Sequence, residues 1–389
     1  MPNSIITGPG SAAAIPEVVQ RLYQGTSRVI RTVIVTSGGF HSRPWSTAIY
    51  KALDGLSIEW LEHRGPVCPA SVALLAGQLR AARPDVVLAV GGGSVLDAAK
   101  SAVRLSGVRD LDAETVIAAC TGSFQPPPVR TPLVAVPTTP GTGAEVTPFA
   151  TVWQPEDNRK LSLADRDLAP AAVILDPDLA SSLSGDQVCA SLLDTLCQGA
   201  EAAWSVRSTA ESTSYGLAAV ALVGPFLGAL DPEQPGESAR LTLQIAGHLS
   251  GQAIALATTS SCHALSYPLT LRAGLTHGHA CAVTFGRMLR YNADVSEADC
   301  ADPRGPDRVR SVIDRIVVAL GAADPDDAGK RVDAFLGDNN LATLPEVPCP
   351  ADLLAREALE YSRIADNPRQ LSHSSLVRQL EGASPGKDD

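Results

Sequence analysis

The first half of the chain contains several short apolar runs. Three of them are rich in β-branched residues and end in Gly, Ser or Thr, at 32–37, 85–93 and 132–139. Apolar residues at consecutive positions, rather than at alternate ones, are typical of parallel strands that are buried on both faces. A further run at 171–180 predicts one more strand, closed by a proline turn.

Stretches with a helical pattern lie between these runs, at 44–54, 69–82 and 94–105. Strand, helix and strand in succession, joined by right-handed crossovers, predict a doubly wound α/β sheet. We therefore expect an α/β domain over residues 1–184.

The pattern changes after about residue 185, where Ala- and Leu-rich stretches of helical length replace the β-branched runs. Breaks that contain Gly and Pro, such as 228–237, separate these stretches. The predicted helices are 186–204, 208–229, 237–257, 279–294, 306–320, 326–338 and 351–361. The sequence thus predicts an all-α domain over residues 185–389.

Charge and composition narrow the range of partners. The formal net charge is −11, which disfavours nucleic acid and anionic membrane surfaces as main partners. No apolar stretch reaches the roughly 20 residues of a membrane span, and the first residues lack the pattern of a signal peptide. The 8 cysteines are scattered without a C-x-x-C pair, as is typical of reduced and often buried thiols. We expect a cytoplasmic protein that binds neither nucleic acid nor membranes.

Three glycines end the predicted strand 85–93. Gly91, Gly92 and Gly93 precede Ser94, which opens a helix. Glycines let the backbone approach a pyrophosphate closely, and a helix N-terminus supplies free N–H groups with partial positive charge. The spacing differs from the G-x-G-x-x-G fingerprint. We favour phosphate binding over a tight turn that only packs the strand against the helix.

A second loop follows the strand 132–139 and contains the hydroxyls of Thr138, Thr139 and Thr142. Ligands bind at the carboxyl edge of an open α/β sheet, so this loop is a candidate second wall of a nucleotide site. Ser37 ends the first strand, where a carboxylate would bind a ribose 2′-hydroxyl. Because Ser37 is uncharged, the site admits NADPH as well as NADH.

A candidate metal site lies in the helical half. Asp194 and Gln198 are four residues apart, and hence on one side of a helix, while His263 and His277 flank a loop with Pro and Gly. An Asp and two His suffice for a divalent metal, but a glutamine amide is a poorer donor than imidazole. The alternative for each His is a hydrogen-bonded core residue. His279 is ambiguous, since it lies two residues from His277.

Five features resemble one family in order and spacing: GGGSVLDAAK (91–100), PTTPGTGAE (137–145), Asp194, CHALSYPL (262–269) and HGHA (277–280). They resemble the iron-dependent (group III) alcohol dehydrogenases over nearly the whole chain. The resemblance implies a dehydroquinate synthase-like fold, with an N-terminal dinucleotide-binding domain and a helical metal- and substrate-binding domain. It also implies NADPH or NADH, Fe²⁺ or Zn²⁺, and a homodimer.

The resemblance implies a role for individual residues. Gly92, Gly93, Ser94 and Asp97 look like the pyrophosphate loop, the three threonines resemble the loop beside the nicotinamide, and Lys160 resembles a nucleotide-side lysine. Asp194, His263 and His277 match three of the four metal ligands of the family. Gln198 stands where the family has His, and Tyr267 stands where many members have a further His.

Within that family, the stretches 149–153, 160–165, 263–281 and 367–372 look most like phosphonoacetaldehyde reductases. This likeness implies reduction of an anionic aldehyde, phosphonoacetaldehyde, to 2-hydroxyethylphosphonate in phosphonate natural-product biosynthesis. A phosphonate favours the forked guanidinium of arginine. We expect Arg272 first, then Arg369 and Arg159, to bind it. The alternative for each is a solvated surface charge.

The expected reaction is hydride transfer from nicotinamide C4 to the aldehyde carbon. A metal on Asp194, His263 and His277 would polarise the carbonyl, and Tyr267 is a possible proton relay. Gln198 leaves a second branch open, a metal-free reductase in which hydrogen bonds polarise the carbonyl. The sequence also leaves open another small aldehyde as substrate, either neutral or a longer phosphono- or carboxy-aldehyde. Two further alternatives are a dehydroquinate synthase-like lyase and a cofactor-binding homologue that has lost activity.

Overall fold

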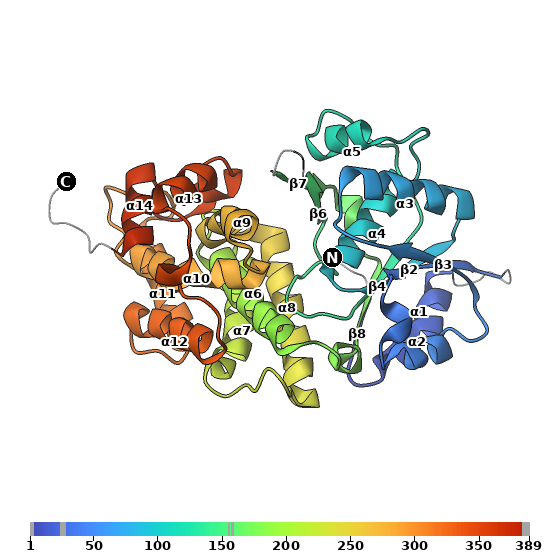
Figure 1. The fold of residues 1–389 in the computed structure, drawn as a ribbon, viewed down its shortest axis with the longest axis horizontal. Coiled ribbons are helices and arrows are strands. Elements are labelled where there is room, and N and C mark those ends of the chain that lie inside the picture. The colour runs from blue at the N-terminus through green and yellow to red at the C-terminus, as the bar shows by residue number, and fades with distance from the viewer. Residues whose placement is uncertain (1–3, 24–28, 155, 157–158, 383–389) are drawn as a thin grey trace. The chain divides into compact units, whose positions relative to one another are not determined.

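The computed structural model of the chain describes residues 4–23, 29–154, 156 and 159–382 (Figure 1). It forms two compact units. One comprises the residues up to Leu183 together with Gly236–Gln244, and the other comprises Ser184–Pro235 and the residues from Ile245 onward. The first unit is α/β and the second is helical, so the predicted fold class is confirmed.

The first unit is built on a parallel six-stranded sheet in the order β1-β8-β5-β4-β2-β3. All of its strand pairs are parallel, and Gly91 lies opposite Pro137, and Ser37 opposite His63, at its carboxyl edge. The strands are β1 (Ser4–Thr7), β8 (Ala172–Leu175), β5 (Leu133–Pro137), β4 (Val86–Gly91), β2 (Arg31–Ser37) and β3 (Ser57–His63).

Helices cover both faces of this sheet (Figure 1). Val87 and Ala89 of β4 face a core with α3, α4 and α5, while Leu88 and Val90 face one with α1 and α2. This alternation explains why β4 is apolar at consecutive positions. The helices are α1 (Ile15–Leu22), α2 (Ser46–Ala52), α3 (Pro69–Ala82), α4 (Gly93–Leu105) and α5 (Ala113–Cys120).

An antiparallel hairpin, β6 (Phe149–Gln154) with β7 (Arg159–Ala164), packs against α4. The carboxylate of Asp97 on α4 accepts a hydrogen bond from the backbone N–H of Thr151 at 3.0 Å. The buried ammonium of Lys100, also on α4, donates to the carbonyl of Phe149 at 2.5 Å and lies 3.1 Å from Asp97 Oδ1. Burial lowers the pKa of Lys100, against the opposing effect of Asp97. The hydrogen bonds of these two α4 side chains to β6 thus fasten the hairpin to α4.

The second unit is a bundle of helices. Its members are α6 (Gly185–Trp204), α7 (Ala210–Val223), most of α8 (Glu237–Ala257), α9 (Ser261–Ala273), α10 (His277–Ala293), α11 (Pro306–Ala319), α12 (Pro325–Asp338), α13 (Ala351–Ala358) and α14 (His373–Glu381). The start of α8 belongs to the first unit, although the sequence placed residues 236–244 in the helical domain. Gln244 holds it there by donating to the carbonyl of Asp176 at 2.9 Å. None of the described helices has the length and apolar character needed to cross a membrane.

Candidate active site

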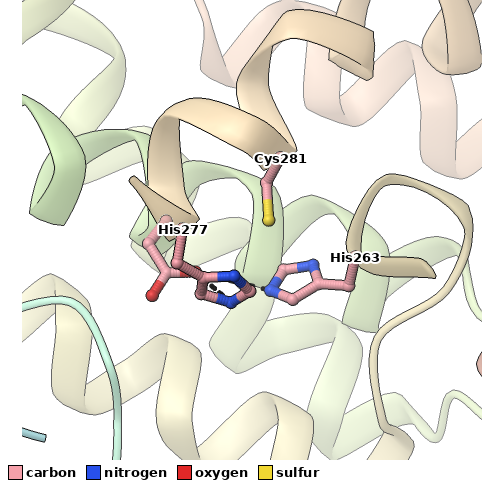
Figure 2. A group of neighbouring side chains, drawn as sticks. His263, His277 and Cys281 are labelled. Carbon is pink, nitrogen blue, oxygen red and sulfur yellow. Dashed lines mark ion pairs between the residues drawn. The ribbon is translucent and has the colours of Figure 1, made fainter. Parts of the chain in front are cut away.

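Asp194, His263 and His277 come together at one point of the helical unit. Asp194 lies in the middle of α6, His263 in the first turn of α9 and His277 at the first residue of α10. Asp194 Oδ1 is 3.4 Å from His263 Nε2 and 3.9 Å from His277 Nε2. The two imidazole rings are 5.2 Å apart and nearly perpendicular (Figure 2).

Two glycines allow this convergence. Gly274 ends α9 in the left-handed conformation, at φ 71°, so that α10 begins three residues later. Gly278, the second residue of α10, touches the backbone of α6, because a Cβ atom there would lie 1.9 Å from the carbonyl oxygen of Ala190. This close contact brings the first turn of α10, and with it His277, against the turn of α6 that carries Asp194.

The geometry fits a divalent cation. Asp194 is buried, and its Oδ1 has no hydrogen-bond partner among the described residues. An orphaned carboxylate oxygen that faces two imidazole nitrogens is costly unless a cation satisfies it. Burial by itself raises the pKa of Asp194, but His277, His263 and Gln198 hold it below its ordinary value. Asp194 is therefore a carboxylate, as a metal ligand must be.

Glu201 belongs to the site although it was not predicted from the sequence. Its fully buried carboxylate accepts hydrogen bonds from Nδ1 of His263, from the backbone N–H of Cys262 at 2.7 Å and from Ser260 Oγ at 3.0 Å. With Nδ1 bound to Glu201, Nε2 is the nitrogen of His263 that faces Asp194, and carboxylates orient metal-binding histidines in this way. The available signal was an acidic residue seven positions after Asp194, on the helix face that also carries Gln198.

Cys281 joins the same cluster. Suitable ligand atoms of Asp194, His263, His277 and Cys281 all lie within 4.8 Å of one another. Figure 2 shows the sulfur of Cys281 pointing toward the two labelled imidazoles. From the sequence we expected the cysteines to be ordinary reduced thiols, although Cys281 follows His277 by four positions and so shares its helix face.

The Gln198 side chain is engaged within the helical unit. Its carbonyl oxygen accepts a hydrogen bond from Ser250 Oγ at 2.9 Å, and its side chain helps to keep the pKa of Asp194 low. His279 points elsewhere, with Nε2 at 2.7 Å from the carbonyl oxygen of Ala342.

Tyr267 forms an aromatic wall beside the cluster. It is buried, and its ring is parallel to that of His277 at 6.3 Å and edge-on to that of Tyr361 at 4.5 Å. The side chain of His277 keeps 35% of its exposure, whereas those of Asp194 and His263 keep 6% and 5%. The cluster is therefore accessible to small molecules on the side of His277.

In the first unit, the structure brings the two predicted cofactor loops together. The backbone N–H of Thr138 donates to the carbonyl of Gly91 at 3.0 Å. A Cβ atom on Gly92 would lie 2.9 Å from Thr139 Oγ1, and one on Gly93 would lie 2.8 Å from Thr142 Cγ2. Only glycine leaves room for this contact. Ser94 lies in the first turn of α4, and Ser37 ends the neighbouring strand β2.

Two residues assigned to the cofactor have other contacts. Asp97 is occupied by Thr151 and Lys100, as described above, and Lys160 on β7 places its ammonium 5.8 Å from the centre of the Trp153 ring. A direct role in cofactor binding stays a prediction for both.

The three candidate substrate arginines lie on separate segments of the chain and have different contacts. Arg272 on α9 makes a bidentate pair with Glu357 and keeps 48% exposure. Arg369 is held more firmly, by Asp299 at 2.6 Å, by the carbonyl of Tyr291 at 2.7 Å and by stacking on the Tyr291 ring. Arg159 begins β7 in the α/β unit. Of the three, only Arg272 shares a helix with His263 and Tyr267.

Comparison with known proteins agrees with this arrangement. The chain is 49% identical over 357 residues to the phosphonoacetaldehyde reductase of Streptomyces viridochromogenes, covering 91% of this chain and 90% of that protein. Its fold matches the sulfoacetaldehyde reductase of Bifidobacterium kashiwanohense in complex with NAD⁺, with TM-score 0.82, 24% identity and coverage of 99% and 98%. It also matches the iron-containing alcohol dehydrogenase of Thermococcus thioreducens, with TM-score 0.81, 23% identity and 98% coverage of both chains.

Two family profiles match almost the entire sequence. The profile "Iron-containing alcohol dehydrogenase" covers residues 2–177, and "Fe-containing alcohol dehydrogenase family, C-terminal" covers residues 188–383. The resemblance found in the sequence is thereby confirmed, and the chain belongs to the iron-containing alcohol dehydrogenase family.

Proposed function

We propose that this chain reduces phosphonoacetaldehyde to 2-hydroxyethylphosphonate with NADPH or NADH. The observation that carries the reductase chemistry is the buried, unsatisfied Oδ1 of Asp194, which faces two imidazole nitrogens. The choice of aldehyde rests on the 49% identity to a phosphonoacetaldehyde reductase over nine tenths of both chains. A place in phosphonate natural-product biosynthesis is part of the proposal.

Asp194, His263 and His277 hold the divalent cation, which when bound supplies a Lewis acid for the carbonyl oxygen. Glu201 keeps Nε2 of His263 available, and Tyr267 packs against the ring of His277. The loop Gly91–Ser94 and the hydroxyls of Thr138, Thr139 and Thr142 bind the pyrophosphate and ribose. A nicotinamide held there would supply the hydride for the aldehyde carbon, and the Tyr267 hydroxyl or water would supply the proton for the carbonyl oxygen.

Arg272 is the arginine that we assign to the phosphonate. Its guanidinium is half-exposed and already binds a carboxylate in bidentate fashion, which is also the geometry that a phosphonate requires. When the substrate binds, its phosphonate would replace Glu357 as the partner of Arg272. Arg369 has three contacts to give up, so it is the weaker choice.

The experiment that tests this function compares aldehydes of different charge. Oxidation of NADPH and of NADH is followed with phosphonoacetaldehyde, sulfoacetaldehyde, acetaldehyde and lactaldehyde. We expect kcat/KM for phosphonoacetaldehyde to exceed that for the neutral aldehydes by at least ~10-fold, since charged hydrogen bonds contribute about 1.5–3 kcal/mol. Equal values would exclude a dedicated phosphonate site. Turnover without net oxidation of the cofactor would instead favour the lyase reaction.

The assembly and the compartment are further parts of the proposal. A homodimer in the cytoplasm is expected, as the family resemblance and the composition predict. Light scattering during size-exclusion chromatography tests the dimer, and a fluorescent fusion in the native host tests the location.

A further inference from the structure

The position at which the family is expected to have a third histidine is glutamine in this chain, yet a fourth strong donor lies nearby. Cys281 is buried on α10, one helical turn after His277, and is the only thiol in the described four-residue cluster. We propose that the Cys281 sulfur is the fourth protein ligand of the metal, and that the centre therefore prefers Zn²⁺ to Fe²⁺. This inference rests on the metal-binding part of the proposed function.

The spacing of the donors supports a common ion. His277 and Cys281 lie at positions i and i+4 of one helix, so both side chains face α6 and α9. Donors around one tetrahedral ion lie roughly 3.3–3.6 Å apart, since Zn–N is about 2.0–2.1 Å and Zn–S about 2.3 Å. The four ligand atoms are all within 4.8 Å of one another, and two of the separations are 3.4 and 3.9 Å. Small side-chain adjustments would complete the coordination shell.

The contacts of Gln198 favour Cys281 over the amide. To act as a ligand, the Gln198 carbonyl oxygen would have to give up its hydrogen bond from Ser250, while the side chain lies on the same helix face as Asp194. Gln198 is thus placed to orient a ligand. This arrangement is the usual one for polar groups outside a metal's direct ligands.

A thiolate ligand changes the net charge and the metal preference of the centre. Binding of M²⁺ releases the thiol proton to solvent, and a thiolate with a carboxylate and two neutral imidazoles leaves a centre of zero net charge. Soft thiolate donors select Zn²⁺ over the harder ions Mg²⁺ and Mn²⁺, and Zn²⁺ already stands above Fe²⁺ in the general order of affinities. A Zn²⁺ ion held by these residues would supply a Lewis acid for the substrate carbonyl.

Cobalt substitution tests the ligand without any assay of turnover. The purified chain is stripped with a chelator, loaded with Co²⁺ and examined by absorption spectroscopy, and the Zn²⁺ form is examined by X-ray absorption. We expect a thiolate-to-cobalt charge-transfer band in the near ultraviolet, and one sulfur at about 2.3 Å from zinc. Because these measurements use the unmodified chain, they do not depend on whether a variant folds.

Variants then show which cysteine supplies the sulfur ligand. In Cys281→Ala and Cys281→Ser we expect loss of the band and a fall in Zn²⁺ affinity of roughly 100-fold or more, beyond what an orienting residue costs. Cys197→Ala is the matched control, because Cys197 is an equally buried thiol outside the cluster and its loss should leave the band intact. Gln198→Ala should also keep the band.

Three outcomes would overturn the inference: stoichiometric Co²⁺ without a sulfur band, loss of affinity in Gln198→Ala but not in Cys281→Ala, or no metal bound at all. An intact sulfur band in a protein that fails to reduce phosphonoacetaldehyde would overturn the proposed function and leave the ligand assignment standing.

Discussion

Glu201 and His263 form a fully buried hydrogen bond that decides which imidazole nitrogen faces Asp194. The two residues come from different helices, α6 and α9, and the bond fixes the ring in the orientation in which Nε2 faces Asp194.

We expect Glu201→Ala to reduce the affinity for Zn²⁺ by about 10–100-fold, because the imidazole of His263 loses its orienting acceptor. Glu201→Gln should lose less, since an amide oxygen can still accept from Nδ1. Competition with a chromophoric chelator measures both. Glu211→Gln, on the exposed side of α7, is the control and should behave as wild type. Equal affinities in all variants would remove the orienting role from Glu201.

Gln198→His tests whether the centre is weakened at this position. We expect the variant to retain more metal through purification than the unmodified chain, because imidazole is a stronger donor than an amide. Elemental analysis of the two proteins measures the occupancy. Near-zero metal in both, after reconstitution with Fe²⁺ and Zn²⁺, would favour the metal-free branch of the mechanism.

Gly278→Ala tests the contact between α6 and α10. A methyl group would overlap the carbonyl of Ala190, so the helices must separate at a cost of about 1–3 kcal/mol or more in the free energy of unfolding. We expect weaker metal binding as well. Chemical denaturation measures the stability. In Gly337→Ala, at a position in α12 with open space around it, we expect an unchanged or slightly raised stability.

Gly92→Ala tests the loop contact in the α/β unit. The new methyl group would press on Thr139 and separate the two loops, so KM for NADPH should rise by at least ~10-fold, or about 1.4 kcal/mol. Steady-state kinetics and direct cofactor titration measure the effect. Gly39→Ala, with open space around it, should bind the cofactor normally. Normal binding in Gly92→Ala would argue against a cofactor role for this loop.

Arg272→Ala tests whether Arg272 binds the phosphonate group of the substrate. We expect KM for phosphonoacetaldehyde to rise by about 10–100-fold while that for acetaldehyde changes little, because only the former offers charged acceptors. Arg356→Ala, which breaks another exposed ion pair, is the control. Equal losses for both aldehydes would show that Arg272 acts only through Glu357.

The sequence predicted those strands and site residues that a short stretch of consecutive residues is enough to identify. The strands β2, β4 and β5 are apolar at consecutive positions and could be found, whereas β3 is an edge strand with several exposed residues, and β1 has only four residues. Asp194, His263 and His277 could be found from motifs. The pairing of Arg272 with Glu357 joins residues 85 positions apart, and no local pattern indicates it.

Dependence on contacts between distant parts of the chain also explains why two residues of the cluster were not predicted. Glu201 and Cys281 lie in apolar helices, and each resembles an ordinary interior residue until α6, α9 and α10 are packed together. Their roles depend on tertiary contacts, to Nδ1 of His263 in one case and to the ligand atoms of three residues in the other.

The contact of Gly278 with α6 has a consequence for attempts to redesign this protein. Since the two backbones already touch, the helices cannot be moved closer together to give the ion a smaller cage, and a larger residue at position 278 would part them only at a cost in stability. An engineer who wishes to change which metal the protein accepts is left with exchanging individual donors, and positions 198 and 281 are the natural pair to swap.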